Sequence, residues 1–473
     1  MFSLKKLLLI ASIFLILPAF LTNGSPSTAR QAKSGFVVEP KQLYTYEVMT
    51  KDLQTLAARY PHLITLQSIG TSEYGRELWQ MDVGSGPAVV LLSGSHHARE
   101  WITTILLMAM ADYAAQAYDS GLRWNGYLAR DLLDQVTFRI VPMLNPDGVT
   151  LQQKGLSAFP QEDHAALLEM NGGSSNFKRW KSNAKGIDLN RQYPADWDNI
   201  QNPAPGPYYM NYKGSRPLEA KEALAMAEIT KISMPELAVA YHSSGEIVYW
   251  NFHTPAENVS RDQRIAAQYA EMTGYRMVKP SRNPSGGGYT DWFISEFGRP
   301  GLTPELARPA GETNVPLKEW DRIWNRHRDI LWMLALEASE LWMNGQIPQL
   351  VNESVRLTAD EAAYQWPSLK SRKLGLLYKG RYMVRREKGG WLEISTADGL
   401  RWIPSRSAIR GPFEKPEALK VKVTPDTAVY QSPLAPWPTP MRMTEQDVPV
   451  LESWNGWYLI QTWEGGYWIK DED

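Results

Sequence analysis

The hydrophobic pattern of the first three quarters of the chain predicts alternating strands and helices. Short apolar runs typical of strands buried on both faces occur at 87–92, 136–141, 237–241 and 301–306. Apolar positions at helical spacing occur at 44–60, 101–118, 218–232, 261–273 and 317–343. Two further runs, 63–69 and 78–83, predict a hairpin at the sheet edge. The segment Asn145-Pro-Asp-Gly148, which follows the run at 136–141, is predicted to be a turn from its composition. We therefore expect an α/β fold with a mostly parallel, mixed and twisted sheet covered by helices on both faces.

The pattern changes after Asn344. Helical periodicity ends, and eight of the 19 tryptophans fall in residues 351–473. Three segments recur 66 positions later: Ala362-Ala-Tyr-Gln-Trp-Pro367 at Ala428, Trp391-Leu-Glu-Ile394 at Trp457, and Trp402-Ile403 at Trp468. A single offset at three places indicates an internal repeat. We expect two small all-β barrels at 355–411 and 419–473, joined to a domain at 40–343 by a linker at 344–354.

The N-terminus and the composition restrict the location and chemistry. Lys5 and Lys6 precede an apolar run at 7–21, which predicts a secretory signal at 1–24 and a leader at 25–39, with an uncleaved anchor as the alternative. The formal net charge of -1 argues against a nucleic-acid partner. The chain has no cysteine, which excludes thiol chemistry and thiolate metal sites. Any metal must therefore be held by His, Asp and Glu.

The stretch Ser93-Gly-Ser-His-His-Ala-Arg-Glu-Trp101 is the first candidate for chemistry. It joins a buried strand to a helix, and in an open α/β sheet the carboxyl ends of strands are where reacting groups collect. His97 and Glu100 are three apart, so both can offer a ligand atom to one cation. The same pair also fits a surface turn with a solvated Glu, so a third ligand is needed to decide.

That third ligand is expected at another strand end. His242 follows the apolar run 237–241, although a polar residue satisfied at a sheet edge is the alternative. Glu305 is a carboxylate inside an apolar strand with no Lys or Arg before Arg308, which indicates a function such as general base. Basic groups that could hold an oxyanion or a substrate carboxylate lie beside these motifs: Arg99, Arg179 and Arg191.

Five motifs in order resemble the zinc carboxypeptidase family: His97-Ala-Arg-Glu-Trp101, Asn145-Pro-Asp-Gly148, Asp188-Leu-Asn-Arg191, Tyr241-His-Ser243, and Asp291-Trp292 followed by Glu305. The resemblance covers about residues 40–343. It implies one zinc ion held by His97, Glu100 and His242, with Glu305 as the catalytic base.

The resemblance also implies a substrate-binding set. The family's residues for the terminal carboxylate and the neighbouring subsite fall on Asn190, Arg191 and Arg99. The residue that sets side-chain preference falls on Thr290, and His96 is not a ligand.

Two positions depart from the family pattern. The place of the mobile active-site tyrosine is taken by Asn283, and Tyr289 is a candidate replacement. The oxyanion arginine has no single match, because Trp180 is flanked by Arg179 and Lys181 and either could take the role.

Within the family, the sequence around these motifs is similar to that of the bacterial γ-D-glutamyl-L-diamino-acid peptidases, which cut peptidoglycan stem peptides. The C-terminal repeats resemble tandem bacterial SH3-like domains, which hold secreted enzymes on the cell wall. Residues 370–422 carry 14 Lys and Arg against 5 Asp and Glu, which suits an anionic wall polymer or a solvated face. Trp391 and Trp457 are favoured as core residues over ligand-binding ones.

These observations predict an exported, wall-associated zinc peptidase acting on stem peptides. Two alternatives stay open. The γ-D-glutamyl-L-diamino-acid peptidases often lack the arginine that stands here as Arg191, so a general metallocarboxypeptidase is the first alternative. A wall-binding protein with an inactive peptidase domain is the other, against which the four intact residues His97, Glu100, His242 and Glu305 speak.

Overall fold

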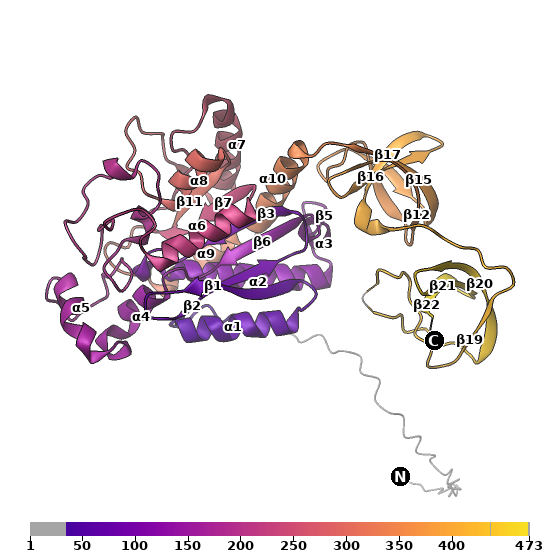
Figure 1. Ribbon diagram of the computed structural model, residues 1–473, viewed down its shortest axis with the longest axis horizontal. Coiled ribbons are helices and arrows are strands. Elements are labelled where there is room, and N and C mark those ends of the chain that lie inside the picture. Colours follow the sequence, from indigo (N-terminus) through magenta and orange to yellow (C-terminus); the bar gives the residue numbers. More distant parts are fainter. Residues whose placement is uncertain (1–34, 436, 472–473) are drawn as a thin grey trace, which may run out of the picture. The chain divides into compact units, whose positions relative to one another are not determined.

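The computed structural model describes residues 35–435 and 437–471, so the expected signal and most of the leader lie outside the described residues. A nine-stranded sheet forms the centre of the N-terminal part (Figure 1). Its strands are β1 (Ile64–Thr71), β2 (Glu77–Val83), β3 (Ala88–Ser93), β6 (Val136–Val141), β7 (Leu237–Ala240), β8 (His242–Ser243), β9 (Ile247–Tyr249), β10 (Arg276–Met277) and β11 (Gly301–Leu306). A separate two-stranded ribbon joins β4 (Arg123–Trp124) to β5 (Tyr127–Leu128).

The sheet is mixed, as predicted. Its order is β1-β2-β6-β3-β7-β11-β9-β10, with β8 paired to β11. β1 and β2 form the antiparallel hairpin at one edge, and β6, β3, β7 and β11 run parallel to one another. β9 returns antiparallel to β11. The parallel strands are almost wholly apolar because helices cover both of their faces.

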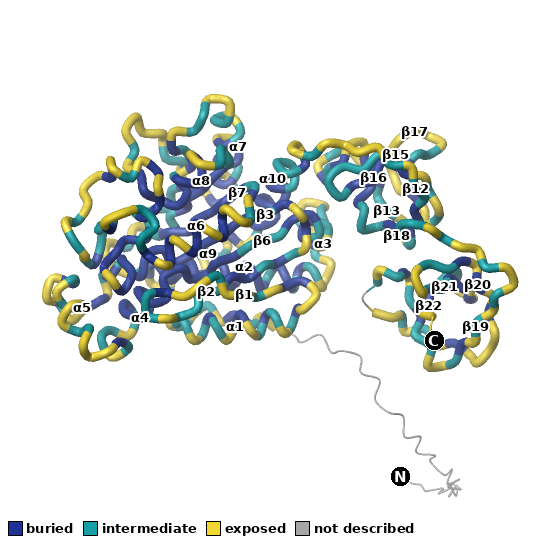
Figure 2. Tube along the Cα trace, viewed as in Figure 1, coloured by how far each residue is buried: buried dark blue, intermediate teal, exposed yellow. Residues whose placement is uncertain are grey.

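Helices lie on both faces of the sheet. The helices are α1 (Tyr46–Arg59), α2 (Ile102–Ser120), α3 (Ala129–Leu133), α4 (Pro146–Lys154), α5 (His164–Met170), α6 (Lys221–Ser233), α7 (Ala256–Thr273), α8 (Tyr289–Phe297), α9 (Trp320–His327) and α10 (Ile330–Gly345). The main core packs α1, α2, α7, α9 and α10 against one face, and a second core packs α6 and α8 against the other. Figure 2 shows the central strands and the helices beside them as the most buried part of the chain.

Two sequence predictions about helices were wrong. The long helix expected at 317–343 is two helices, since α9 ends at His327 and α10 begins at Ile330. The segment Asn145-Pro-Asp-Gly148, interpreted as a turn, is the start of α4. The Oδ1 of Asn145 accepts a hydrogen bond from the N–H of Gly148 at 3.0 Å, and Pro146 occupies the first helical turn, where its missing N–H costs nothing.

Two all-β units follow α10. The first has a seven-stranded sheet: β12 (Gln349–Leu357), β13 (Glu361–Tyr364), β14 (Lys373–Leu377), β15 (Gly380–Lys388), β16 (Trp391–Thr396), β17 (Gly399–Pro404) and β18 (Ala408–Arg410). The second has a four-stranded sheet: β19 (Lys420–Val423), β20 (Gln446–Trp454), β21 (Trp457–Thr462) and β22 (Gly465–Lys470). β12 begins inside the segment expected to be a linker, because it pairs with both β15 and β18.

The two units use the same aromatic contact at positions 66 apart. In the first, the ring of Tyr364 meets Trp391 edge to face at 5.3 Å between centroids, and in the second Tyr430 meets Trp457 in the same way at 5.0 Å. Trp391 is 1% exposed, which agrees with a core role, whereas Trp457 is only partly buried.

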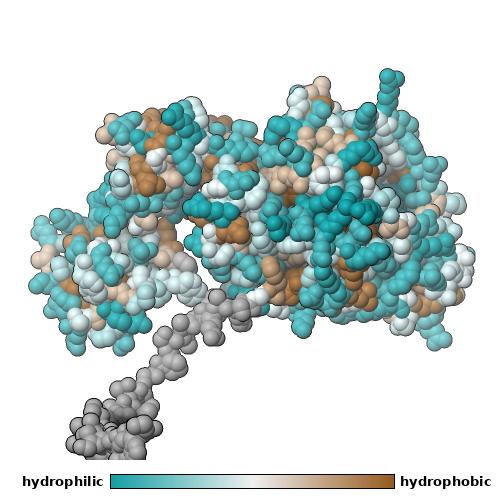
Figure 3. Space-filling view, turned by 180° about the vertical axis from the view of Figure 1, so that it is seen from behind, coloured by the Kyte–Doolittle hydropathy of each residue, from teal (hydrophilic) through white to brown (hydrophobic). Residues whose placement is uncertain are grey.

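The surface mixes polar and apolar side chains. In the face seen in Figure 3, hydrophobic residues form small groups among hydrophilic ones. Within residues 35–435 and 437–471, no helix combines the length and the hydrophobicity that a membrane crossing requires.

One buried acid in α6 makes the stability of the fold depend on pH. Glu222 is fully buried, and its carboxyl group accepts hydrogen bonds from the backbone N–H of Glu73 at 3.4 Å and from Asn183 Nδ2 at 3.2 Å. Burial, with a smaller contribution from the charges of Asp147 and Glu73, raises the pKa of Glu222 to about 8.

We predict that replacing Glu222 by Gln flattens the pH dependence of unfolding. Between pH 4.5, the ordinary pKa of Glu, and about 8, the unfolded chain releases the proton that the folded chain keeps, so the parent loses stability as pH rises through this range, by a few kcal/mol. Urea unfolding at pH 5 and pH 8 measures the loss, with Glu228→Gln on the exposed side of α6 as the control. If Glu222→Gln lost as much free energy of unfolding between pH 5 and pH 8 as the parent does, this account would be contradicted.

Candidate metal centre

His97 and Glu100 are positioned by the turn between β3 and α2. His97 immediately precedes the short 3-10 helix η1 (Ala98–Glu100), and its Nδ1 lies 2.8 Å from Glu100 Oε1. The turn is fixed from outside, since the N–H of Ala98 donates to the carbonyl of Lys181 at 2.9 Å. The side chain of Asn145 donates to the carbonyl of His96 at 3.1 Å, so the start of α4 also holds this turn.

His242 reaches the same point from the neighbouring strands. Its Nδ1 lies 3.0 Å from His97 Nδ1 and 3.0 Å from Glu100 Oε2, and the N–H of Ser243 donates to the same carboxylate at 3.1 Å. The three side chains are 6%, 5% and 1% exposed for His97, Glu100 and His242. One ligand atom from each lies within 4.8 Å of the other two.

This donor set fits a zinc ion. Two imidazole nitrogens and one carboxylate oxygen form a three-ligand set of the kind that catalytic zinc sites use, which leaves a position for water or substrate. Burial alone would raise the pKa of Glu100, but His97 and His242 hold it below its usual range, so the carboxylate is ionised and can bind a cation.

Asp188 supports the site, and sequence reasoning did not give it this role. Its Oδ1 lies 3.2 Å from His97 Nε2, and its Oδ2 accepts a hydrogen bond from Lys181 Nζ at 2.8 Å. Asp188 is fully buried, yet the charges of Lys181 and His97 outweigh burial and lower its pKa well below the ordinary value. A carboxylate on the second nitrogen of a metal-binding histidine fixes the ring and its tautomer. The available signal was its place at the head of the motif Asp188-Leu-Asn-Arg191.

Glu305 lies beside His242 through strand pairing. β11 runs parallel to β8 with Glu305 opposite His242. Burial, and after it the negative charge of Glu100, raises the pKa of Glu305 to about 7, although His242, Lys181 and Arg99 partly offset the rise. A carboxyl group whose pKa lies near neutrality next to a metal site is suited to exchange a proton.

The basic residues differ in what they contact. The guanidinium of Arg179 donates to the side chain and backbone of Asn171 and lies 3.8 Å from the centre of the Tyr209 ring. Lys181 instead binds Asp188, the partner of His97. Arg99 donates to the carbonyl of Arg179 at 3.0 Å. Lys181, rather than Arg179, therefore lies next to the metal ligands.

The expected substrate residues divide into two groups. Asn190 and Arg191 follow Asp188, and Arg191 donates to the carbonyl of Gln201 at 2.9 Å and to Asn211 Oδ1 at 3.3 Å. Asn190 Oδ1 accepts the backbone N–H of Tyr289 at 3.0 Å, which ties this loop to the start of α8.

Thr290 and Tyr289 occupy that start of α8. The hydroxyl groups of Thr290 and Thr303 are hydrogen-bonded, so Thr290 lies against β11. Tyr289 does not face the metal centre: its ring is fully buried, and its hydroxyl lies 3.0 Å from Thr230 Oγ1 on α6. The structure therefore gives no support to Tyr289 as a replacement for the mobile tyrosine, because its side chain belongs to the second core.

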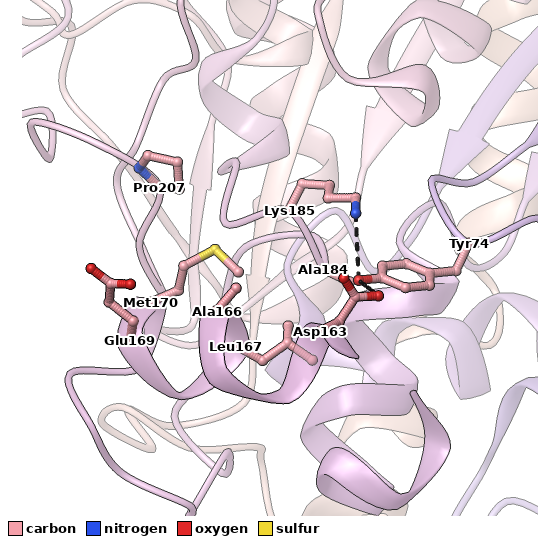
Figure 4. Close-up of a pocket in the computed structure, with 9 residues that line it drawn as sticks. All are labelled: Tyr74, Asp163, Ala166, Leu167, Glu169, Met170, Ala184, Lys185 and Pro207. Carbon is pink, nitrogen blue, oxygen red and sulfur yellow. Dashed lines mark hydrogen bonds between the residues drawn. The ribbon is translucent and has the colours of Figure 1, made fainter. Parts of the chain in front are cut away.

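A cavity of about 380 Å³ lies elsewhere, beside α5. Figure 4 shows Lys185 above the ring of Tyr74, whose hydroxyl lies 3.0 Å from Asp163 Oδ2, with Leu167 and Met170 on the apolar side. None of its lining residues is a metal ligand, so this cavity is separate from the candidate centre.

Comparisons with known proteins agree with the fold and the site. The sequence profile of the zinc carboxypeptidase family matches residues 49–328. The chain is 34% identical over 293 residues to γ-D-glutamyl-L-diamino acid endopeptidase 1 of Lysinibacillus sphaericus, covering 61% of this chain and 71% of that protein. It is 26% identical over 293 residues to the inactive metallocarboxypeptidase ECM14 of Arthroderma gypseum, covering 54% of this chain and 45% of that protein. The fold is similar to that of thrombin-activatable fibrinolysis inhibitor, with a TM-score of 0.52, 17% identity, and 66% and 78% of the two chains covered.

The fold and the buried ligand set define a zinc peptidase. The family match then identifies the chain plainly: it belongs to the zinc carboxypeptidase family and is a zinc-dependent hydrolase.

We predict that Asp188→Asn weakens zinc binding about 10- to 100-fold, because the charge that orients His97 is lost. Competition with a zinc-binding dye measures the affinity. Asp198→Asn, at an exposed carboxylate a short distance along the chain, serves as the control and should leave it unchanged. Parent-like affinity in Asp188→Asn would show that His97 does not need this partner.

Proposed function

We propose that this protein hydrolyses the γ-D-glutamyl-L-diamino acid bond of peptidoglycan stem peptides. The observation that carries the proposal is the 34% identity to γ-D-glutamyl-L-diamino acid endopeptidase 1 over 61% of this chain. The family match at residues 49–328 contains His97, Glu100, His242 and Glu305. Carboxypeptidases of the same family hydrolyse peptides. We infer that this site is suited to hydrolyse an amide bond next to a residue with a free carboxylate.

The side chains around the centre have complementary tasks in this proposal. Zinc, when bound, polarises the carbonyl group and lowers the pKa of water. Glu305, with its pKa near 7, accepts a proton from the attacking water and returns it to the leaving amine. Lys181 and Arg99 supply the positive charge that stabilises the developing oxyanion. The buried position of the ligands strengthens each of these interactions, because little water screens them.

We further propose that the protein is exported and held on the cell wall by its C-terminal units, as SH3-like domains. The signal pattern at 1–24 supports export. Exposed aromatic side chains support binding of a flexible polymer: Trp366 is 63%, Tyr378 69% and Trp463 67% exposed. The local excess of positive charge in 370–422 suits an anionic partner.

A general metallocarboxypeptidase is the second candidate. Arg191 favours it, because this residue stands where the family resemblance places the contact to a terminal carboxylate. Its guanidinium donates to Gln201 and Asn211 and lies 3.6 Å from Asp188, so a substrate carboxylate would have to displace or share these contacts. The inactive alternative is disfavoured because the three metal-binding side chains converge and Glu305 pairs with His242.

One comparison of substrates separates these three functions. The protein is incubated, with and without a chelator, with a γ-D-glutamyl-diaminopimelate peptide and with an ordinary peptide that has a free C-terminus. Chelator-sensitive release of diaminopimelate from the first alone is the expected result. Release from the second alone would establish the general carboxypeptidase, and no release from either would establish an inactive domain.

We predict that Glu305→Gln lowers kcat by a factor of about 100 to 10,000, because the amide cannot accept the proton, while zinc stays bound. Turnover and zinc content are measured on the same sample. Glu296→Gln, on the exposed face of α8, is the matched control. Parent-like turnover in Glu305→Gln would refute its role as base.

We predict that Lys181→Met lowers kcat about 100- to 1,000-fold, the cost of removing one oxyanion donor, and that Arg179→Met lowers it much less. The difference follows from their contacts, since Lys181 binds Asp188 and Arg179 binds Asn171. Zinc content is measured for both variants, so that a loss of metal is not mistaken for a loss of catalysis. The reverse order of effects would assign the oxyanion to Arg179.

A further inference from the structure

Three neighbouring strands place a row of side chains on one face of the sheet. β9 runs antiparallel to β11 with Tyr249 opposite Thr303 and Ile247 opposite Glu305, and β10 runs parallel to β9 with Arg276 opposite Ile247. Residues directly opposite one another on paired strands point to the same face, and so do residues two apart on one strand. All five side chains therefore share a face of the sheet.

This is the face of the metal centre. Glu305 pairs with His242, and Thr303 is hydrogen-bonded to Thr290 of α8, which covers the same side. The alternating residues point the other way, and Val248 and Leu302 belong to the main core. The row thus runs from the proposed catalytic base outward to the end of the sheet at Arg276.

Arg276 is an exposed cation at that end, and no residue of opposite charge in the described part of the chain forms an ion pair with it. Two other arginines nearby in the fold, Arg322 and Arg326, both pair with Glu246. An unpaired arginine beside a reaction centre is available for a planar anionic group, which a guanidinium can bind through two parallel hydrogen bonds.

Tyr249 connects Arg276 to the reaction centre electrostatically. Burial and the charge of Glu305 raise the pKa of Tyr249, and Arg276 lowers it, so both charges act on the same phenol. Tyr249 is nevertheless 46% exposed, which leaves its ring open to a ligand that lies along the row. Adjacent strands are about 4.8 Å apart, so the backbones at Arg276 and Glu305 are separated by about 10 Å. This distance can be spanned by the extended side chain of a long amino acid together with the side chain of an arginine.

We propose that Arg276 binds the side-chain carboxylate of a diaminopimelate-type residue on the leaving side of the scissile bond. The inference rests on the proposed function and adds which diamino acid the site selects. Diaminopimelate ends in an ammonium and a carboxylate, whereas lysine ends in an ammonium alone. The guanidinium of Arg276 attracts the side-chain carboxylate of diaminopimelate and repels the side-chain ammonium of lysine. One side chain therefore supplies both the favourable contact and the discrimination between the two amino acids.

The test compares three γ-D-glutamyl peptides that differ only at the leaving residue: diaminopimelate, diaminopimelate with its side-chain carboxylate amidated, and lysine. The zinc-loaded parent should give the highest kcat/KM with the first. Arg276→Gln should lower kcat/KM for that peptide about 10- to 100-fold, the range for a charged hydrogen bond, and change the other two by less than about threefold. Lys279→Gln, an exposed cation three residues away, is the matched charge control and should change none of them.

The amidated peptide isolates the carboxylate. If Arg276 binds that group, amidation and Arg276→Gln remove the same interaction, so their effects should not add. Arg276→Lys should restore part of the preference because it keeps the charge and loses the planar fork. An equal loss for all three peptides, or no loss for the first, would overturn the inference.

The test also separates failure of this inference from failure of the proposed function. Cleavage of none of the three peptides by the parent would contradict the proposed function. Calorimetric binding of the same peptides to Glu305→Gln, with and without Arg276→Gln, then decides the point. Tighter binding of the diaminopimelate peptide that is lost with Arg276→Gln supports the inference, and equal affinity for the three peptides overturns it.

Discussion

The parallel pairing of β3, β7 and β11 is the constraint on which the site depends. The registers place Ser93 beside Ala240, and Glu305 beside His242, so the strands end at a common edge. The turn after β3 carries His97 and Glu100 to that edge, although they lie more than 140 residues from His242 in the chain. A slip of one residue in β11 would turn Glu305 into the core and bring Leu306 or Pro304 to the metal face. The apolar residues that fix this register are therefore as necessary to catalysis as the ligands.

Charge balance is the second requirement of this centre. Glu100 and Asp188 are buried carboxylates that would be costly if left without partners. The imidazole of His97 lies between them, and Lys181 binds the outer oxygen of Asp188. A divalent cation among His97, Glu100 and His242 completes this arrangement. The same charges therefore order the site and bind the zinc ion. This explains why Lys181 binds Asp188, the partner of His97, instead of extending into solvent.

Sequence reasoning was most accurate where one physical signal dominated. The apolar runs of β6 and β11 predicted those strands residue for residue, because burial on both faces leaves no other pattern. His97 and Glu100 were found because they lie in the turn that follows such a run, and His242 because it stands at the end of one. Asn145 was misread because Pro, Asp and Gly are typical of turns and of helix starts alike. Residue spacing could not decide between Arg179 and Lys181, because the decision depends on tertiary contacts. For the same reason it could not show that the side chain of Tyr289 points into the core. The strands β8 to β10 are only two or three residues long, too short to leave a periodic signal.

The central claim is that His97, Glu100 and His242 hold one zinc ion. X-ray absorption at the zinc edge, combined with metal analysis of the purified protein, tests it most directly. The account predicts one zinc per chain, with two imidazole nitrogens at about 2.0 to 2.1 Å and oxygen ligands beside them. It also predicts that His97→Ala with His242→Ala abolishes both the metal and the imidazole signal. Zinc retained by that double variant with an unchanged spectrum would contradict the account.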